Sequence, residues 1–353
     1  MFRTKLLPLA GLSCINSRSF SNASAASAST DSHYDLIVIG GGSGGLAAAK
    51  RSAEYKKKVL IIEHNKWGGT CVNVGCVPKK IMYNAAHVAE TIKHSGQFGY
   101  SVPAVSFDWG NLKRSRDVYI GRLNNIYIGG LNRLNIDRIE NEGYASFASD
   151  GKSINVNGKT YTSDHVVIAV GGAPNSLGVP GDEYAIDSDG FFELEKQPKK
   201  CAVIGAGYIA VELAGVMHTL GTDTSLFVRG DKALRAFDEM LSTTLDQTMR
   251  KEGINIRGGS IIKELIKESD GTITIHLNDG TSHGGYDCVV KATGRHPVTD
   301  KLNLPNNIEQ MKSGHLITDE YQNTSVSGIY CLGDASDKFV DLTPMAIAAG
   351  RRL

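Results

Sequence analysis

Two cysteines, Cys71 and Cys76, have the residue type and the surroundings that thiol chemistry requires. They are five residues apart, between a glycine pair and a predicted helix that begins near Pro78. A regular helix would aim their Cβ atoms apart, so a disulfide between them needs a distorted turn, which Gly75 can supply. Lys79 and the N-terminal end of the helix would stabilise a thiolate. The segment therefore predicts a redox-active thiol pair, with two buried structural thiols as the alternative.

The residues before this pair have the pattern of a dinucleotide-binding unit. A strand is predicted at Tyr34–Ile39, a helix at Leu46–Tyr55 and a second strand at Val59–Ile62, which ends on Glu63. The pattern G-x-G-x-x-G between the first strand and the helix is formed by Gly40, Gly42 and Gly45. Such glycines let the backbone approach a pyrophosphate at a helix N-terminus, and an acid about twenty residues further on binds ribose hydroxyls. The complete pattern predicts a dinucleotide site.

A second unit of the same kind begins with a predicted strand at Cys201–Ile204. The run Gly205-Ala206-Gly207-Tyr208-Ile209-Ala210 follows it, fits G-x-G-x-x-A and opens a helix. The second strand of this unit, Thr224–Val228, ends on Arg229 rather than on an acid, and Arg235 follows. An acid would repel a 2′-phosphate, whereas arginines would form charge-assisted hydrogen bonds with it. This difference predicts NADPH rather than NADH, with solvated surface arginines as the alternative.

Short predicted strands follow each unit and indicate an internal duplication. Turn residues at Asp150-Gly151 and Asn157-Gly158 mark one β-meander, and Asn278-Asp279-Gly280 marks a second. Each meander leads into a further strand and a glycine-containing exit. The sequence therefore predicts an α/β protein with two Rossmann-like, three-layer nucleotide-binding domains, each with a β-meander.

Composition excludes several classes of protein. Lys and Arg number 38 against 37 Asp and Glu, a net charge of +1, so neither nucleic acid nor an anionic membrane surface is expected as a partner. No run is apolar enough to span a bilayer. Cys201, Cys288 and Cys331 lie in or beside apolar predicted strands and are interpreted as small core residues rather than as a disulfide framework. No metal site is expected.

The first residues, Met1–Thr30, differ in composition from the rest of the chain. They contain Arg3, Lys5 and Arg18, many Ser and Ala, and no Asp or Glu. This is typical of a mitochondrial transit peptide, with a disordered tail as the alternative. We expect a mitochondrial protein, or one shared between the mitochondrion and the cytoplasm.

The run GGTCVNVGCVPKK at 68–80 resembles the redox-active segment of the flavoprotein disulfide reductases, the class I pyridine nucleotide-disulfide oxidoreductases. Its CVNVGCVPKK form is similar to the glutathione reductase branch of this family, and the likeness extends from Tyr34 to Leu353. The resemblance implies the FAD/NAD(P)-binding fold. It places a transit peptide at 1–30, a first part of the FAD domain with the redox disulfide at 31–172, an NADPH domain at 173–298 and a second part of the FAD domain at 299–353.

The resemblance also implies the cofactor contacts. Those with FAD would come from the first unit, the cysteine segment and the C-terminal motifs: Gly40, Gly42, Ser43, Gly44, Gly45, Glu63, Thr70, Cys71, Lys79, Ala145, Asp334 and Thr343. Those with NADPH would come from the second unit and its glycine exit: Gly205, Ala206, Gly207, Ile209, Glu212, Arg229, Arg235 and Gly294.

By the same resemblance, the reaction is the NADPH-dependent reduction of glutathione disulfide through a Cys71–Cys76 disulfide. Cys76 would face the flavin, and Cys71 would attack the substrate. Tyr208 would shield the flavin until the nicotinamide displaces it, and Glu212 would pair with a buried Lys79 beside the flavin. A core tyrosine and a helix-surface ion pair are the alternatives at these positions.

Glutathione disulfide carries several carboxylates, so its site should be cationic and lined by tyrosine. The family positions correspond to Ser43, Lys50, Tyr127 and Arg351. Lys50 departs from the usual Arg of the family, and it keeps the charge but loses the bidentate fork. Core packing is the alternative for Tyr127, as it is for Tyr119 on the same face of a helix predicted at Phe107–Leu134.

The chain stops at Leu353, inside a helix predicted to start at Met345. The C-terminal interface domain of the family is absent from these residues, and with it the His and Glu that the partner subunit of a homodimer would supply as an acid–base pair. We therefore expect a homodimer for the full-length form and little or no activity for the truncated chain. The alternatives are a thioredoxin reductase of the large type and a non-catalytic FAD/NADPH-binding fragment.

Overall fold

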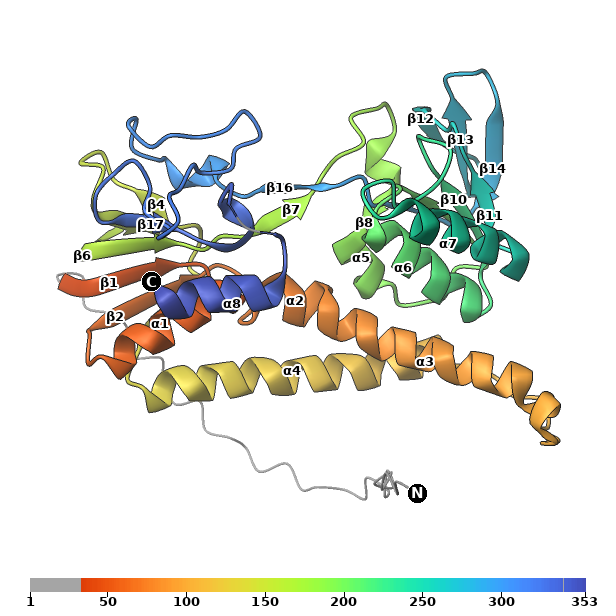
Figure 1. Cartoon of the computed structure of the whole chain (residues 1–353), viewed down its shortest axis with the longest axis horizontal. Coiled ribbons are helices and arrows are strands. Elements are labelled where there is room, and N and C mark those ends of the chain that lie inside the picture. The colour runs from red at the N-terminus through yellow and green to blue at the C-terminus, as the bar shows by residue number, and fades with distance from the viewer. Residues whose placement is uncertain (1–32, 339) are drawn as a thin grey trace.

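The computed structural model describes residues 33–338 and 340–353, so the predicted transit peptide at 1–30 lies outside the described residues. Two α/β halves lie side by side in Figure 1 and are joined by two short antiparallel strands, β7 (Gly172–Pro174) and β16 (Arg295–Pro297). The chain leaves the first half along β7 and returns to it along β16. The expected domain boundaries near 172 and 298 lie at these strands.

The first half is built on a sheet with strand order β3-β2-β1-β6-β5-β4, and β17 pairs with β6. The strands β3, β2, β1, β6 and β17 are parallel, whereas β4 and β5 form an antiparallel meander with β6. The strands are β1 (His33–Ile39), β2 (Val59–Glu63), β3 (Asp137–Glu140), β4 (Ser146–Phe147), β5 (Ile154–Val156), β6 (Lys159–Ile168) and β17 (Ile329–Cys331). The helices are α1 (Ser43–Glu54), α2 (Gly69–Val74), α3 (Cys76–His94), α4 (Trp109–Arg133) and α8 (Thr343–Arg352).

Strand β1 shows why this half has three layers. Leu36 and Val38 are buried in a cluster with residues of α1 and α8, whereas Ile37 and Ile39 are buried in a cluster with residues of the meander. Because successive side chains of a strand point to opposite faces, a fully apolar strand needs cover on both sides. Helices therefore cover one face of the sheet and the meander covers the other (Figure 1).

The second half repeats this plan with a five-stranded parallel sheet of order β11-β10-β9-β15-β8 and a separate antiparallel meander, β12-β13-β14. The strands are β8 (Ile186–Asp187), β9 (Lys200–Ile204), β10 (Asp223–Phe227), β11 (Asn255–Arg257), β12 (Ile262–Lys267), β13 (Ile273–Leu277), β14 (Ser282–Tyr286) and β15 (Cys288–Lys291). The helices are α5 (Ser188–Glu193), α6 (Tyr208–Thr219) and α7 (Glu239–Glu252). Short 3-10 turns are η1 (Ser95–Phe98), η2 (Asp182–Tyr184), η3 (Asp300–Leu302) and η4 (Gly333–Ala335). The predicted fold class, two Rossmann-like halves each with a meander, is confirmed.

The cysteine segment differs in detail from its prediction. The helix expected near Pro78 begins at Cys76, and a separate short helix, α2, contains Cys71. The two helices are interrupted at Gly75, the residue at which the sequence predicts a distortion. The long helix predicted at Phe107–Leu134 is confirmed as α4, with Asp108 as its N-cap. None of the described helices combines the length and apolar character needed to cross a membrane.

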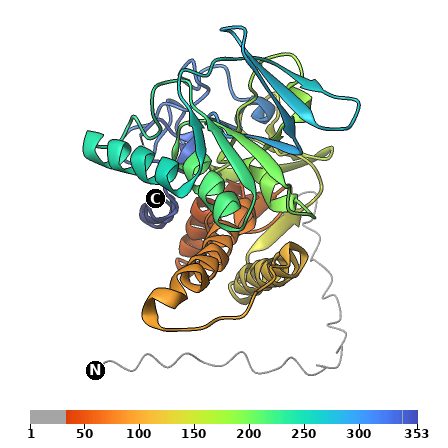
Figure 2. The same ribbon diagram turned by 90° about the vertical axis from the view of Figure 1, so that its right-hand side faces the viewer.

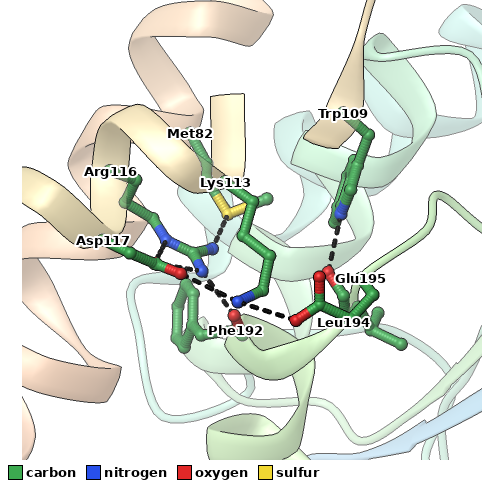
Figure 3. Close-up of polar contacts among 8 residues, drawn as sticks. All are labelled: Met82, Trp109, Lys113, Arg116, Asp117, Phe192, Leu194 and Glu195. Carbon is green, nitrogen blue, oxygen red and sulfur yellow. Dashed lines mark hydrogen bonds and ion pairs between the residues drawn. The ribbon is translucent and has the colours of Figure 1, made fainter. Parts of the chain in front are cut away.

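Helices α3 and α4 run next to one another and extend from the first half beneath the second, as both Figure 1 and Figure 2 show. Polar contacts hold α4 to the end of α5 and to the loop after it (Figure 3). Arg116, only 3% exposed, donates to the carbonyl oxygen of Phe192 and to Met82 Sδ. Lys113 Nζ lies 3.1 Å from a carboxylate oxygen of Glu195. These contacts tie the first half to the second at a place distant from β7 and β16.

Trp109 and Asp117 complete this set of contacts. Trp109 Nε1 donates to the carbonyl oxygen of Leu194 at 2.8 Å, and Asp117 accepts from both Lys113 and Arg116. Burial by itself would raise the pKa of Asp117, but the hydrogen bonds from these two cations lower it overall. Asp117 therefore stays charged and compensates the buried guanidinium.

Candidate active site

The break at Gly75 places Cys71 and Cys76 next to one another. Gly75 has φ −144° and ψ −118°, and a Cβ there would lie 2.8 Å from the carbonyl oxygen of Thr70 and 3.2 Å from Cys71 Cα. Only glycine fits so close to the preceding turn. Both cysteines are free in the structure. Each side chain shifts the pKa of the other, so the two thiols lie close together.

The proton of this pair is held on Cys71. The contact with Cys71, together with contacts to Thr343 and Lys79, lowers the pKa of Cys76 to about 6. The same contact and burial raise the pKa of Cys71 well above its usual range. Cys76 is the first residue of α3, and its Sγ lies 3.9 Å from Oγ1 of Thr343, the first residue of α8. Two helix N-termini therefore converge on the Cys76 sulfur, which favours its thiolate.

Lys79 and Glu212 form the predicted ion pair across the two halves. Lys79 Nζ lies 2.9 Å from Glu212 Oε1, which joins α3 to α6. The side chain of Lys79 is 30% exposed and that of Glu212 is 38% exposed. A groove of about 440 Å³ between α3 and α6 opens beside the pair and accounts for this exposure.

Tyr208 lies at the start of α6, where the two halves meet. It is 49% exposed, so the alternative of a core tyrosine does not hold. Burial raises its pKa, and the charges of Arg295, Asp341, Asp334 and Glu212 act on it at close range. The first residue of the second nucleotide helix therefore faces the segment around η4 of the first half.

The first glycine turn is shaped for a ligand that approaches the backbone. Gly40 has φ +110°, and a Cβ there would lie 2.2 Å from the carbonyl oxygen of Ala169. A Cβ at Gly45 would lie 1.9 Å from the carbonyl oxygen of Gly40. The turn leads directly into α1, whose N-terminal N–H groups have no partner within the helix. Such a turn leaves a backbone-lined cradle that an anionic pyrophosphate fits.

Glu63 ends β2 beside this turn, as the sequence predicts. It is 7% exposed and accepts hydrogen bonds from the backbone N–H groups of Gly41 and Asn65, both at 2.7 Å. His64 stacks on Tyr144 with ring centroids 4.5 Å apart, so the segment before Ala145 lies beside the end of β2. The structure thus brings the predicted contacts of the first unit to one edge of the sheet.

The second glycine turn has the same construction. Gly205 has φ +150°, and a Cβ there would lie 2.2 Å from the carbonyl oxygen of Ala292. Arg229 and Arg235 lie beyond the end of β10, and both are exposed. Within the described part of the chain, neither forms an ion pair or a hydrogen bond, and the Arg235 side chain lies over Gly230. Two uncompensated cations beside a nucleotide turn fit an additional phosphate group.

The remaining predicted residues of the second unit lie around this turn. The carbonyl oxygen of Ala206 accepts from the backbone N–H of Leu234, which ties the arginine-bearing loop to the glycine turn. Gly207 is the N-cap of α6, and Ile209 lies in its first turn. Gly294 accepts a hydrogen bond from Asn175 N at 3.0 Å, beside the strand pair β7–β16.

The predicted substrate residues lie around α1. Lys50 Nζ is 5.2 Å from the centroid of the Tyr127 ring. Burial, followed by the nearby Arg133, lowers the pKa of Lys50. Burial and the adjacent Cys71 raise the pKa of Tyr127, so this ring lies near the thiol pair. Tyr127 also packs against the core, whereas Tyr119 on the same helix is 46% exposed.

Helix α8 brings Arg351 to the same region. Gly350 packs so closely on α1 that a Cβ there would lie 2.4 Å from the carbonyl oxygen of Gly44. Arg351 follows Gly350 and is exposed, and Ser43 is the first residue of α1. Lys50, Tyr127 and Cys71 are thus near one another, and Ser43 and Arg351 lie on the two helices that pack beside them.

Sequence reasoning missed three residues of this site. Asn73 donates to the carbonyl oxygen of Gly69 at 2.9 Å, and Asn124 of α4 donates to that of Trp67 at 2.6 Å and to Asn73 Oδ1 at 3.0 Å. This network fixes α2, and hence Cys71. Arg295, beside Tyr208, donates to the carbonyl oxygen of Gly172. Arg295 could have been found from the sequence, because it directly follows Gly294. Nothing in the sequence marked Asn73 or Asn124 as residues of the site.

Two nucleotide turns of one construction, with a dithiol at the contact between the halves, define a nucleotide-dependent thiol–disulfide oxidoreductase. The model of the family described as pyridine nucleotide-disulphide oxidoreductase matches residues 34–350, and the chain belongs to this family.

Two characterised relatives are both named glutathione reductase. The chain is 46% identical to that of Yarrowia lipolytica over 335 residues, which cover 91% of this chain and 71% of the relative. It is 46% identical to that of Schizosaccharomyces pombe over 306 residues, which cover 84% of this chain and 65% of the relative. The matched region is thus about two thirds of the length of these relatives.

Proposed function

We propose that this protein is a flavoprotein that uses NADPH to reduce glutathione disulfide to glutathione. The observation that carries the proposal is the adjacent pair Cys71 and Cys76 at the contact between two nucleotide-binding halves, with the pKa of Cys76 lowered to about 6. Two relatives of 46% identity that are named glutathione reductase support this choice of substrate. The protein would thereby maintain the thiol redox balance of its compartment.

FAD is the proposed ligand of the first half and NADPH that of the second. The cradle at Gly40 and the acid Glu63 fit the pyrophosphate and a ribose of FAD. The cradle at Gly205 fits the pyrophosphate of NADPH, and the uncompensated Arg229 and Arg235 fit its 2′-phosphate. When bound, the two cofactors would supply hydride transfer and the two electrons that reduce the disulfide.

The residues of the chain supply the thiol chemistry. After Cys71 loses its proton, its sulfur attacks one sulfur of glutathione disulfide, which forms a mixed disulfide and releases one glutathione thiolate. The Cys76 thiolate then attacks Cys71 Sγ, re-forms the Cys71–Cys76 disulfide and releases the second glutathione thiolate. Each thiolate takes up one proton. Lys79, paired with Glu212, keeps positive charge beside the Cys76 thiolate throughout.

Charge and aromatic surface near the thiols suit this substrate. Lys50 and Arg351 would attract the carboxylates of glutathione, and Tyr127 would pack against its peptide. We also propose that the complete protein is a homodimer in which the partner subunit supplies the acid–base group for the thiols. Sedimentation of the protein expressed from its whole coding sequence tests this, and a monomeric species with full activity would contradict it.

The proposed function is tested by the oxidation of NADPH in the presence of glutathione disulfide, with protein expressed from the whole coding sequence. We expect Cys71→Ser and Cys76→Ser each to reduce the turnover by at least roughly 1,000-fold, because each removes one sulfur of the relay. Cys331→Ala, at a buried thiol of β17, is the matched control and should keep its activity. Faster turnover of oxidised thioredoxin than of glutathione disulfide would refute the substrate.

We propose mitochondrial import for residues 1–30 on the basis of their composition alone. A fusion of this segment to a fluorescent protein should enter mitochondria, and replacement of Arg3, Lys5 and Arg18 by Gln should leave the fusion in the cytoplasm. Uniform cytoplasmic fluorescence of the unchanged fusion would contradict the proposal.

A further inference from the structure

Two further thiols, Cys201 and Cys288, lie together in the second half, outside the site described above. Cys201 is on β9 and Cys288 is the first residue of β15, and the two are Cα partners in adjacent parallel strands. Both side chains belong to the same buried cluster, so they project from the same face of the sheet. Cys201 Sγ donates to the carbonyl oxygen of Ala202 at 3.6 Å. The two thiols are close enough that each shifts the pKa of the other.

The positions of these residues suit a disulfide. Strands in a sheet are about 4.8 Å apart, which lies inside the Cα separation of about 4.4 to 6.8 Å that disulfides adopt. The two free cysteines, as Cα partners on adjacent strands, therefore lie at a backbone separation that a disulfide can adopt. Cys331, the remaining buried cysteine described, belongs to a different buried cluster, in the first half.

We propose that Cys201 and Cys288 are a second redox pair, which hydrogen peroxide or a related hydroperoxide converts to a disulfide that links β9 to β15. Cys288 reacts first, because it is 7% exposed and Cys201 is 0% exposed. The Cys288 thiolate attacks one oxygen of the peroxide and breaks its O–O bond, which gives a sulfenic acid and releases hydroxide. Cys201 then attacks the sulfenic sulfur, forms the S–S bond and expels a second hydroxide.

The protons of the two thiols convert both hydroxides to water. Two thiols and one peroxide thus yield one disulfide and two waters, and two electrons pass from sulfur to peroxide. The pKa values agree with this order of events. The contact with Cys201 lowers the pKa of Cys288, whereas the same contact and burial raise that of Cys201.

The consequence of the bond is a more stable second half rather than a change in nucleotide binding. Cys201 and Cys288 lie near the N-terminal ends of their strands, where Asp287 already accepts from the backbone of Lys199 and Lys200. Gly205 lies four residues on, roughly 13 Å away at the opposite edge of the sheet. The bond closes a long loop that contains α6, α7 and the meander, and long loops gain the most from closure.

Peptide mapping of the protein tests the pair. The reduced protein is treated with graded hydrogen peroxide, its free thiols are alkylated in guanidinium chloride, and unreduced peptides are identified by mass spectrometry. We expect a peptide containing Cys201 linked to one containing Cys288, with Cys331 alkylated as the internal control. Recovery of Cys201 and Cys288 as alkylated thiols, at peroxide levels that fully oxidise Cys71 and Cys76, would overturn the proposal.

A thermal melt separates the stabilising effect from bond formation. In a Cys71→Ser, Cys76→Ser background, peroxide should raise Tm by roughly 5 °C. The same treatment should leave the Tm of a variant that also carries Cys201→Ala unchanged. An equal rise in both proteins, or a linked peptide with no rise in Tm, would show that the bond does not stabilise the second half. If the alanine variant fails to fold, the peptide map of the unchanged chain still decides whether the pair forms.

Discussion

The two glycine turns have one backbone construction but opposite charge beside them. Gly40 and Gly205 both have positive φ, and a Cβ at either would lie 2.2 Å from a carbonyl oxygen of the neighbouring strand exit. The first unit ends its second strand on Glu63, whereas the second strand of the second unit ends at Phe227 and Arg229 follows two residues later. Under the proposed function, the shared turn fits a dinucleotide, and the charge near the end of the second strand distinguishes FAD from NADPH.

Glu63 and Arg229 also differ in their burial and in their contacts with the rest of the protein. Glu63 is buried and already holds two backbone N–H groups, whereas Arg229 is exposed and has no partner among the described residues. An acid held in place costs little further ordering when it binds a ligand, but a free arginine must be ordered by the ligand itself. The first site therefore suits a resident cofactor and the second suits one that exchanges.

The largest effect should come from adding a Cβ at one turn and comparing it with the other. Gly40→Ala should reduce FAD affinity by at least roughly 100-fold, because the positive φ and the 2.2 Å contact both force the backbone to move. Gly205→Ala should do the same for NADPH and leave bound FAD in place. Flavin absorbance and NADPH titration measure the two losses. Gly121→Ala, at a helix position with open space, is the control, and loss of both ligands in either turn variant would contradict two independent sites.

Removing Arg229 and Arg235 tests whether the positive charge beside the second glycine turn determines the nucleotide preference. Arg229→Ala with Arg235→Ala should lower the preference for NADPH over NADH by roughly 100-fold to 10,000-fold, because each arginine contributes about 1.5 to 3 kcal/mol to a phosphate. The ratio of kcat/KM for the two nucleotides measures this preference. Lys251→Ala, an exposed cation on α7, should leave the ratio unchanged. Equal losses with both nucleotides would remove the proposed 2′-phosphate contact.

The counterpart in the first half is Glu63→Gln. The amide keeps one acceptor oxygen but turns an NH2 group toward a backbone N–H, at a cost of about 1 to 3 kcal/mol. FAD affinity should fall roughly 10-fold to 100-fold, as measured by flavin release on dilution. Glu54→Gln removes only an exposed ion pair with Arg51 and should have no measurable effect. Unchanged FAD affinity in Glu63→Gln would show that the Glu63 carboxylate holds the backbone of the glycine turn but does not contribute to FAD binding.

Cys76 of the first half and Cys201 of the second should differ in how their reactivity depends on pH. Because the pKa of Cys76 is lowered to about 6, its alkylation by iodoacetamide in the reduced protein should rise roughly 10-fold from pH 5 to pH 7. Cys201 should stay unreactive over this range, since burial and the contact with Cys288 raise its pKa. Site-resolved mass spectrometry measures both rates. A midpoint for Cys76 near the usual thiol value would contradict the stabilised thiolate.

Local sequence determined the elements that could be predicted. The strand, glycine turn, helix and acid of the first unit lie within thirty residues, and each depends on steric rules that act over a few residues. The break at Gly75 was foreseeable for the same reason. The ion pair between Lys79 and Glu212 was predicted through family resemblance, whereas the groove beside it, between α3 and α6, arises only in the folded chain.

Contacts between distant segments could not be predicted. Asn73 and Asn124 are far apart in the sequence, and their hydrogen bond exists because α4 packs beside α2. Arg116 is a charged residue in a polar helix, so the sequence alone would place it at the surface. In the structure it is buried against the second half. The register of β9 with β15, which makes Cys201 and Cys288 neighbours, likewise follows from the parallel sheet and not from either strand alone.

The contacts of Arg116 have a consequence for how a nucleotide reaches the flavin side of the molecule. With β7–β16 on one side and α4 on the other, the halves contact one another at two separate places, and these contacts oppose a hinge motion between them. Access must then be controlled by something smaller than a domain. Tyr208 lies half exposed at the first turn of α6, where the two halves meet, and a single ring at this place can move while both halves stay still.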